Sequence, residues 1–147
     1  MHNWVLRVKK DNVIVDKSKV FALRIIKLYK YLNEEKREYI LSKQLVRSGT
    51  SIGANIMEAI RGQSNADFTA KMNIALKEAS ETEYWLELLH KSDYLTNEQF
   101  DSIHTDCIEI LKILMAIINS SRKENNALRI MNYALCIMNC SSLLHRS

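Results

Sequence analysis

The sequence contains no proline and only three glycines among its 147 residues. All-β sandwiches and barrels need a turn signal every ~8–12 residues, and proline and glycine supply most of these signals. Their scarcity argues against an all-β fold and favours long helices joined by short connections. The length suits one domain with its own hydrophobic core.

Long uncharged apolar runs are also absent. The most apolar stretch, residues 108–118, includes Glu109 and Lys112 and is shorter than the ~20 residues needed to cross a bilayer. The first ten residues lack the order of charge and apolar run that marks a signal peptide. The odd number of cysteines, three, argues against a disulfide framework. We therefore expect a cytoplasmic protein with reduced thiols and no membrane partner.

Charge is spread unevenly along the chain, whose net charge is +4. Residues 1–62 carry 13 basic and 6 acidic residues, whereas residues 63–125 carry 6 basic and 11 acidic ones. A basic half beside an acidic half can bind a polyanion, or the two halves can attract each other between subunits.

The spacing of apolar residues predicts an all-α fold with four helices. They are expected at residues 16–32, 35–61, 66–91 and 96–123. Because the connections are short, neighbouring helices should pack as an antiparallel up-down-up-down four-helix bundle. The predicted organisation is an extended N-terminal arm (1–15), the bundle (16–125) and a C-terminal extension (126–147) that begins after an interruption at Asn125 and Asn126 and could hold a further short helix.

Helix caps support these boundaries. Asp16 or Ser18 can cap the first helix, and Ser64 or Asn65 the third, since short polar side chains accept hydrogen bonds from the free N–H groups of a first turn. The fourth helix is preceded by Thr96-x-x-Gln99, the spacing of a capping box.

The first and fourth helices are more apolar than a monomeric bundle requires. A core-facing stripe needs about three residues in seven, but residues 108–118 contain eight large apolar side chains in eleven positions. Surplus apolar surface usually marks an association site, so we expect a homo-oligomer. The alternative is that the C-terminal segment folds back and covers the fourth helix.

Two glycines lie in the middle of the second helix, four residues apart and therefore on one face. Each costs about 1 kcal/mol relative to alanine, which a close approach of another backbone would offset. If the chain folds back near residue 64, residue 47 lies level with residue 81, and each glycine lies level with an alanine of the third helix. The predicted seam comprises Gly49, Gly53, Ala75, Ala79 and an ion pair between Arg47 and Glu81.

The same region resembles a known family. Residues 42–56 read SKQLVRSGTSIGANI, residues 71–89 read KMNIALKEASETEYWLELL and residues 23–29 read LRIIKLY. These strings are similar to the signature of the bacterial four-helix-bundle proteins encoded in 23S rRNA intervening sequences, over residues 13–124. The resemblance implies a four-helix bundle that assembles as a homopentamer. A related branch, the accessory protein of diversity-generating retroelements, is implied to bind nucleic acid and a reverse transcriptase through a basic surface.

Basic residues gather on the first two predicted helices. Repeated by the symmetry of an oligomer, they could form a ring of positive potential for a phosphate backbone. The alternative is a solvated face that pairs with the acidic half. The candidate nucleic-acid-binding residues are Arg24, Lys27, Lys30, Lys36, Arg37, Lys43 and Arg47.

Two carboxylate-x-x-His pairs are candidate metal ligands. Glu87 and His90 end the third helix, and Asp101 and His104 begin the fourth, a spacing found in di-metal carboxylate bundles. The second pair of carboxylates that such a site needs is missing from the first two helices. Both histidines also lie near helix ends, where solvent reaches them. We therefore expect no metal site.

A smaller candidate metal site lies in the C-terminal extension, where Cys136, Cys140 and His145 have helical spacing. A structural zinc site usually has four ligands, so these three residues do not make one. No catalytic residues and no cofactor are expected either.

The sequence thus predicts a non-catalytic, homo-oligomeric scaffold that binds RNA or DNA through its basic surface. The alternative is a protein–protein assembly module without a nucleic-acid role. A metal-dependent enzyme using His90 and His104 is the third reading.

Overall fold

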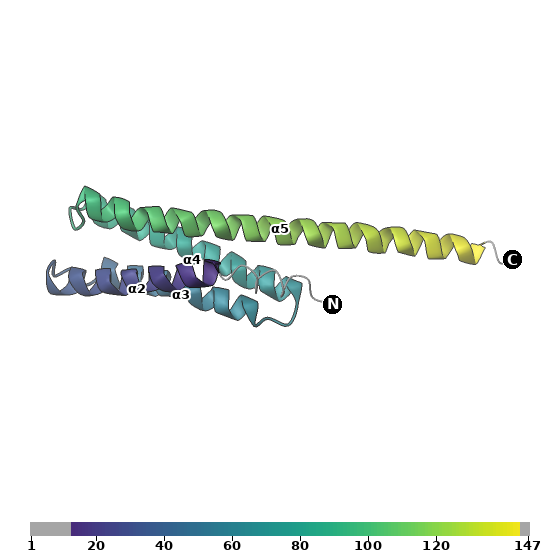
Figure 1. Cartoon of the computed structure of the whole chain (residues 1–147), viewed down its shortest axis with the longest axis horizontal. Coiled ribbons are helices and arrows are strands. Elements are labelled where there is room, and N and C mark those ends of the chain that lie inside the picture. Colours follow the sequence, from purple (N-terminus) through teal and green to yellow (C-terminus); the bar gives the residue numbers. More distant parts are fainter. Residues whose placement is uncertain (1–12, 145–147) are drawn as a thin grey trace.

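The computed structural model describes the backbone of residues 13–144 and the side chains of residues 13–135 other than Tyr133. Within these residues four α-helices follow one another, each antiparallel to the one before (Figure 1). They are α2 (Val13–Glu34), α3 (Leu41–Ile60), α4 (Asn65–Lys91) and α5 (Asn97–Leu144). The predicted all-α up-down-up-down bundle is confirmed.

The core is built from apolar side chains spaced three or four residues apart on each helix, so that each helix turns one stripe inward. The largest fully buried side chains include Phe21 and Ile25 of α2, Leu45, Ile52 and Ile56 of α3, Phe68, Met72 and Leu86 of α4, and Ile110 of α5. Among the described residues, none of the helices combines the length and apolar character needed to cross a membrane.

Two of the predicted helix caps are present. The Ser64 hydroxyl accepts a hydrogen bond from the Asp67 backbone N–H (3.1 Å). Before α5, the Gln99 N–H donates to the Thr96 hydroxyl (3.2 Å) and the Thr96 N–H donates to the Gln99 side chain (3.0 Å). This reciprocal pair is the predicted capping box.

The first helix begins earlier than predicted. α2 starts at Val13, so Asp16 and Ser18 lie inside it rather than at its cap, and residues 13–15 are helical instead of belonging to an extended arm. Ser18 is buried, and its hydroxyl donates back to the Val15 carbonyl (2.9 Å). The rest of the predicted arm, residues 1–12, lies outside the described residues.

The second helix begins later than predicted, at Leu41 instead of residue 35. Residues 35–40 form an irregular connection, and Glu38 within it caps the helix that follows. Its carboxylate accepts hydrogen bonds from the backbone N–H groups of Ile40, Leu41 and Ser42, at 2.7–2.9 Å. Burial alone would raise the pKa of Glu38, but these three N–H groups outweigh it and hold the pKa below its ordinary value. The buried carboxylate therefore serves as the cap of α3.

The fourth helix does not end near residue 123. α5 is a single helix of 48 residues, and Asn125 and Asn126 do not interrupt it. The Asn65 side chain donates a hydrogen bond to Asn125, which anchors α5 at the end of the bundle. Beyond that point α5 runs straight out past the other helices (Figure 1). The fold-back of the C-terminal segment over α5, considered as an alternative, does not occur within the described part of the chain.

The fold-back between α3 and α4 has the predicted register. Arg47 makes an ion pair with Glu81, as expected. In the buried part of the same interface, the Thr82 hydroxyl donates to the Ser48 hydroxyl (2.9 Å).

The glycines, however, turn toward a different helix from the one predicted. A Cβ on Gly49 would lie 2.8 Å from Cγ2 of Ile25, and a Cβ on Gly53 would lie 3.3 Å from the Ser18 hydroxyl. Ile25 and Ser18 belong to α2, so the glycines open toward α2 and not toward Ala75 and Ala79 of α4. Arg47 and Glu81 lie at the same height along the bundle, as predicted. The height of a residue along its helix does not determine which neighbouring helix its side chain faces.

The two alanines are fully buried elsewhere in the core. The carbonyl of Ala79 accepts a hydrogen bond from the Cys107 thiol (3.6 Å), which places this part of α4 against α5. The small residues of α3 and α4 therefore serve two different interfaces instead of one shared seam.

Candidate functional site

Two of the seven candidate nucleic-acid-binding residues are occupied by contacts within the bundle. Arg24 of α2 makes an ion pair with Asp106 of α5 and also donates to the Ser102 hydroxyl (2.7 Å). Arg47 makes ion pairs with Glu81 and with Glu78 (3.3 Å). Both guanidinium groups join helices together, so they are poorly placed to bind phosphate.

The other five candidates gather at one end of the bundle. Lys27 and Lys30 lie on the last two turns of α2, Lys36 and Arg37 in the connection, and Lys43 in the first turn of α3. All five side chains are exposed, and within the described part of the chain no ion pair joins any of them to a carboxylate. We call these five residues the basic end.

The backbone of the connection shapes the basic end. Arg37 has a φ of 53°, a left-handed conformation that is uncommon for a residue with a side chain. The ammonium group of Lys36 lies 5.9 Å from the centroid of the Tyr31 ring, within cation–π range.

Acidic groups also lie at this end of the bundle. The carboxylate of Glu38 is buried and committed to the backbone of α3. Glu34 and Glu35 are exposed in the same turn, so around the α2–α3 connection the five cations outnumber the two exposed carboxylates. The α4–α5 connection and the first turns of α5, at the same end of the bundle, carry three more exposed carboxylates: Asp93, Glu98 and Asp101. The positive excess is therefore local to the α2–α3 connection.

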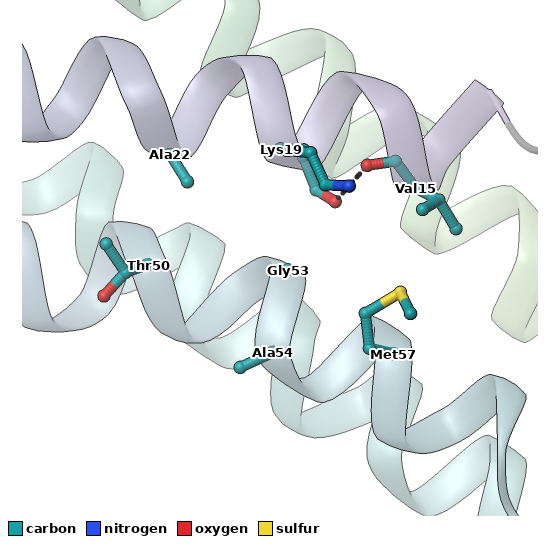
Figure 2. A pocket seen from close by; sticks show the side chains of 8 residues that line it. Val15, Lys19, Ala22, Thr50, Gly53, Ala54 and Met57 are labelled. Carbon is teal, nitrogen blue, oxygen red and sulfur yellow. Dashed lines mark hydrogen bonds between the residues drawn. The ribbon is translucent and has the colours of Figure 1, made fainter.

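A shallow groove of about 180 Å³ lies between α2 and α3 (Figure 2). Small residues form its floor because Gly53 has no side chain and the neighbouring positions are alanine, serine and threonine. Its rim carries the exposed Met57 and Lys19. The groove is lined by Val15, Ser18, Lys19, Ala22, Thr50, Gly53, Ala54 and Met57. Such a groove suits a protruding apolar side chain more than a charged ligand.

The structure regroups the candidate metal ligands. Glu83, Glu87 and His104 place one ligand atom each within 4.8 Å of one another. His104 is already 3.0 Å from Glu83, so the two form an ion pair when the histidine is protonated. Glu83 escaped the sequence analysis because only carboxylate-x-x-His spacing was considered, whereas Glu83 meets His104 from another helix.

The other two expected members of that group lie apart from it. His90 makes a hydrogen bond with the side chain of Asn97 (2.8 Å) and stacks on Phe100 at 4.3 Å. Asp101 is exposed and does not join the three. The absence of a metal site remains a prediction.

Cys107 is the one cysteine whose side chain is described. It lies in the core, and burial raises the pKa of its thiol to about 12, with further contributions from Glu83 and Asp106. A thiol with such a pKa stays protonated and unreactive at neutral pH. Cys136, Cys140 and His145 lie outside the described side chains.

Comparison with known proteins decides the family. Residues 10–116 match the family of 23S rRNA-intervening sequence proteins. The chain belongs to this family. The family match includes α2, α3, α4 and the first half of α5, but it ends before the part of α5 that leaves the bundle.

A solved structure from the S23 ribosomal protein family of Bacteroides thetaiotaomicron VPI-5482, described as a protein of unknown function, is 61% identical to this chain. The TM-score is 0.74, and the alignment covers 98% of that chain but 75% of this one. No curated protein matches the sequence. This member of the family is thus longer than its solved relative.

Proposed function

We propose that this protein is a non-catalytic, homo-oligomeric scaffold that binds RNA or DNA through the basic end. The proposal rests on one observation: the five exposed cations gather around the α2–α3 connection, and none of them makes an ion pair with a carboxylate of the described residues. Exposed lysine and arginine side chains that are not held in ion pairs can release the counterions of a phosphate backbone, which is the main source of non-specific affinity.

Oligomerisation strengthens this proposal. The homopentamer implied by the family resemblance would repeat the basic end five times around one axis and turn a modest local charge into a ring. Arg24 and Arg47 drop out of the proposed surface because each of them already holds two helices together. The proposed binding residues are therefore Lys27, Lys30, Lys36, Arg37 and Lys43.

The test is fluorescence anisotropy of a labelled single-stranded RNA and a matched DNA at low and at physiological salt. Three exposed lysines of the basic end are replaced in one variant: Lys27→Gln, Lys30→Gln and Lys43→Gln. The control changes three exposed lysines elsewhere, Lys77→Gln, Lys112→Gln and Lys123→Gln, and has the same net charge.

If the basic end contacts phosphates, the first variant should lose most of its affinity, and its slope of log affinity against log salt should flatten by about 2, since each phosphate on a single strand contributes ~0.7. The control should bind as the unmodified protein does. Equal losses in both variants would point to net charge alone, and no binding of the unmodified protein at low salt would refute the proposal.

A protein–protein assembly module is the second candidate, and one observation favours it. Val13, Val20 and Leu23 are large apolar residues of α2 that are exposed. Exposed apolar residues gathered on one helix are typical of an association surface. If light scattering gives an oligomer while anisotropy gives no nucleic-acid binding, this second function is the better one.

A further inference from the structure

No helix of the described residues covers the second half of α5. The hydrogen bond between Asn65 and Asn125 marks where α5 leaves the bundle, and the helix continues to Leu144. At 1.5 Å per residue, the part beyond Asn125 is roughly 28 Å long. Figure 1 shows it running past the ends of the other helices.

An apolar face continues along this projecting part. Leu128, Met131 and Leu135 have exposed fractions of 51%, 56% and 50%. They lie i, i+3 and i+7 apart, so the three side chains share one side of the helix. We call these three residues the α5 apolar face.

The same side of α5 is covered where the bundle surrounds it. The three residues follow Ile110, Ile113 and Ile117 by 18 positions each, which is about five full turns of an α-helix. Ile110 is only 1% exposed, and Ile113 and Ile117 pack partly buried against the core. The face that the bundle covers in the first half of α5 therefore continues uncovered in the second half.

A helix that projects alone is poorly supported. Most of the stability of a helix in a protein comes from packing its apolar side against another element. Exposed apolar stripes of this kind usually bind a partner. A second helix packed along the α5 apolar face would bury these side chains and stabilise the projecting part of α5.

We propose that the partner is the same face of a second copy of this chain, packed antiparallel. Between residues 125 and 135 the only charged residue is Arg129, which lies about 100° around the helix from Leu128. The flanking Ala127 and Ala134 are small and uncharged, so two identical helices can approach without like-charge repulsion. Such a contact is self-complementary and closes by two-fold symmetry.

The antiparallel direction follows from the position of α2. Asp106 lies four residues before Ile110, on the same side of α5, and it makes its ion pair with Arg24 of α2. The α5 apolar face thus points to the side on which α2 lies, beyond the point where α2 begins. In a parallel pair the partner's bundle would lie level with this bundle and would collide with α2, whereas in an antiparallel pair the two bundles lie at opposite ends of the paired helices.

The pairing gives the molecule a second way to associate, separate from any contact between bundles. The basic end lies at the opposite end of the bundle from the projecting helix (Figure 1). A pair joined through α5 would hold two basic ends far apart. If the basic ends bind nucleic acid as proposed above, such a pair can hold two separate segments. The pairing itself does not depend on that function.

The test compares the mass of the full chain with that of two variants by light scattering and sedimentation velocity. In Leu128→Asp/Leu135→Asp the α5 apolar face receives two charges. In the control, Asn126→Asp/Ile130→Asp, the same charges are placed on exposed positions of the opposite side of the helix. RNA anisotropy of both variants is measured in parallel, because the basic end is unchanged in each.

We expect the face variant to have half the mass of the unmodified protein, whether the bundle itself is a monomer or an oligomer, and the control to keep the full mass. A face variant of unchanged mass would overturn the proposal, including the case in which residues 1–12 of the same chain cover the face. Equal loss in both variants would overturn the assignment to this face. The milder Leu128→Ala/Leu135→Ala variant should weaken the pairing about tenfold or more, and it guards against misfolding. Loss of RNA binding with intact pairing, or the reverse, separates this proposal from the proposed function.

The direction is tested with a spin label on Arg122→Cys, with the native cysteines replaced. An antiparallel pair places the two labels at opposite ends of the paired helices and gives a long label-to-label distance. The signal of this distance should disappear when Leu128→Asp/Leu135→Asp is added. A short distance that vanishes in the same way would show a parallel pair and refute the antiparallel arrangement.

Discussion

α3 packs against its two neighbours in two different ways. Toward α4 it presents polar groups, the buried Ser48 hydroxyl bonded to Thr82 and the Arg47 guanidinium bonded to Glu81. Toward α2 it presents two glycines, Gly49 and Gly53. Because they have no side chain, Ile25 and Ser18 of α2 can come close to the backbone of α3. The first interface depends on matching hydrogen-bond partners and the second on volume. Substitutions on the two sides should therefore fail for different reasons.

The largest effect is expected on the α2 side. Gly49→Leu places a side chain where even a Cβ would lie 2.8 Å from the buried Ile25, and overpacking of this kind costs about 1–3 kcal/mol. Chemical denaturation should show the loss. Gly53→Ala is the control, since its Cβ would meet the Ser18 hydroxyl at 3.3 Å and the gain in helix propensity, up to ~1 kcal/mol, offsets the contact. Equal destabilisation of both variants would mean that volume does not distinguish the two glycines.

The buried hydrogen bond on the α4 side should have a smaller effect. Thr82→Val keeps the shape of the side chain but removes the donor to Ser48, which should cost about 1 kcal/mol of unfolding free energy. Ser80→Ala removes an exposed hydroxyl from the same helix and should change stability by less than ~0.5 kcal/mol. A Thr82→Val variant as stable as the unmodified protein would show that this bond contributes nothing net.

The ion pair at the rim of the same interface should have the smallest effect. Arg47→Gln should cost less than ~1 kcal/mol and lose its effect in high salt, because the Arg47 side chain is about half exposed. The hydrogen bond from Arg47, followed by that from Trp85, holds the pKa of Glu81 below its ordinary value of 4.5. This contribution is therefore complete above pH 4.5 and is lost as the pH falls through the lowered pKa of the folded state.

The measurement for this last prediction is the difference in unfolding free energy between Arg47→Gln and the unmodified protein, followed from pH 7 downward. The difference should shrink as Glu81 becomes protonated. Lys43→Gln, an exposed lysine with no ion pair among the described residues, should give no such trend. A difference that stays constant down to acid pH would show that the ion pair with Glu81 is not its source.

Local signals predicted local features well. The Thr96–Gln99 capping box and the Ser64 cap formed as expected because each involves atoms only three residues apart. Glu38 was missed as the cap of α3 because it reaches forward across an irregular turn that contains the left-handed Arg37.

Longer-range features were predicted only in part. The level of Arg47 with Glu81 follows from helix length and the position of one turn. The same reasoning could not tell that Arg24 meets Asp106, because that contact joins residues 82 positions apart and depends on how α2 and α5 close the bundle. The sequence therefore could not show which of the seven basic residues make ion pairs within the bundle and which stay exposed.

The sequence by itself determined the all-α fold, the direction of each helix and the α3–α4 register, because periodicity, caps and short connections act over a few residues at a time. Membership of the family also followed from the sequence, through the match over residues 10–116. Only the tertiary structure decided which face of each helix is used. It turned the glycines toward α2, tied Arg24 and Arg47 into the bundle and left the basic end without ion pairs to the other described residues. It also carried α5 past the bundle with an apolar face uncovered. These outcomes depend on how four helices rotate to fill one core, and that rotation is set by all the side chains together rather than by any one segment.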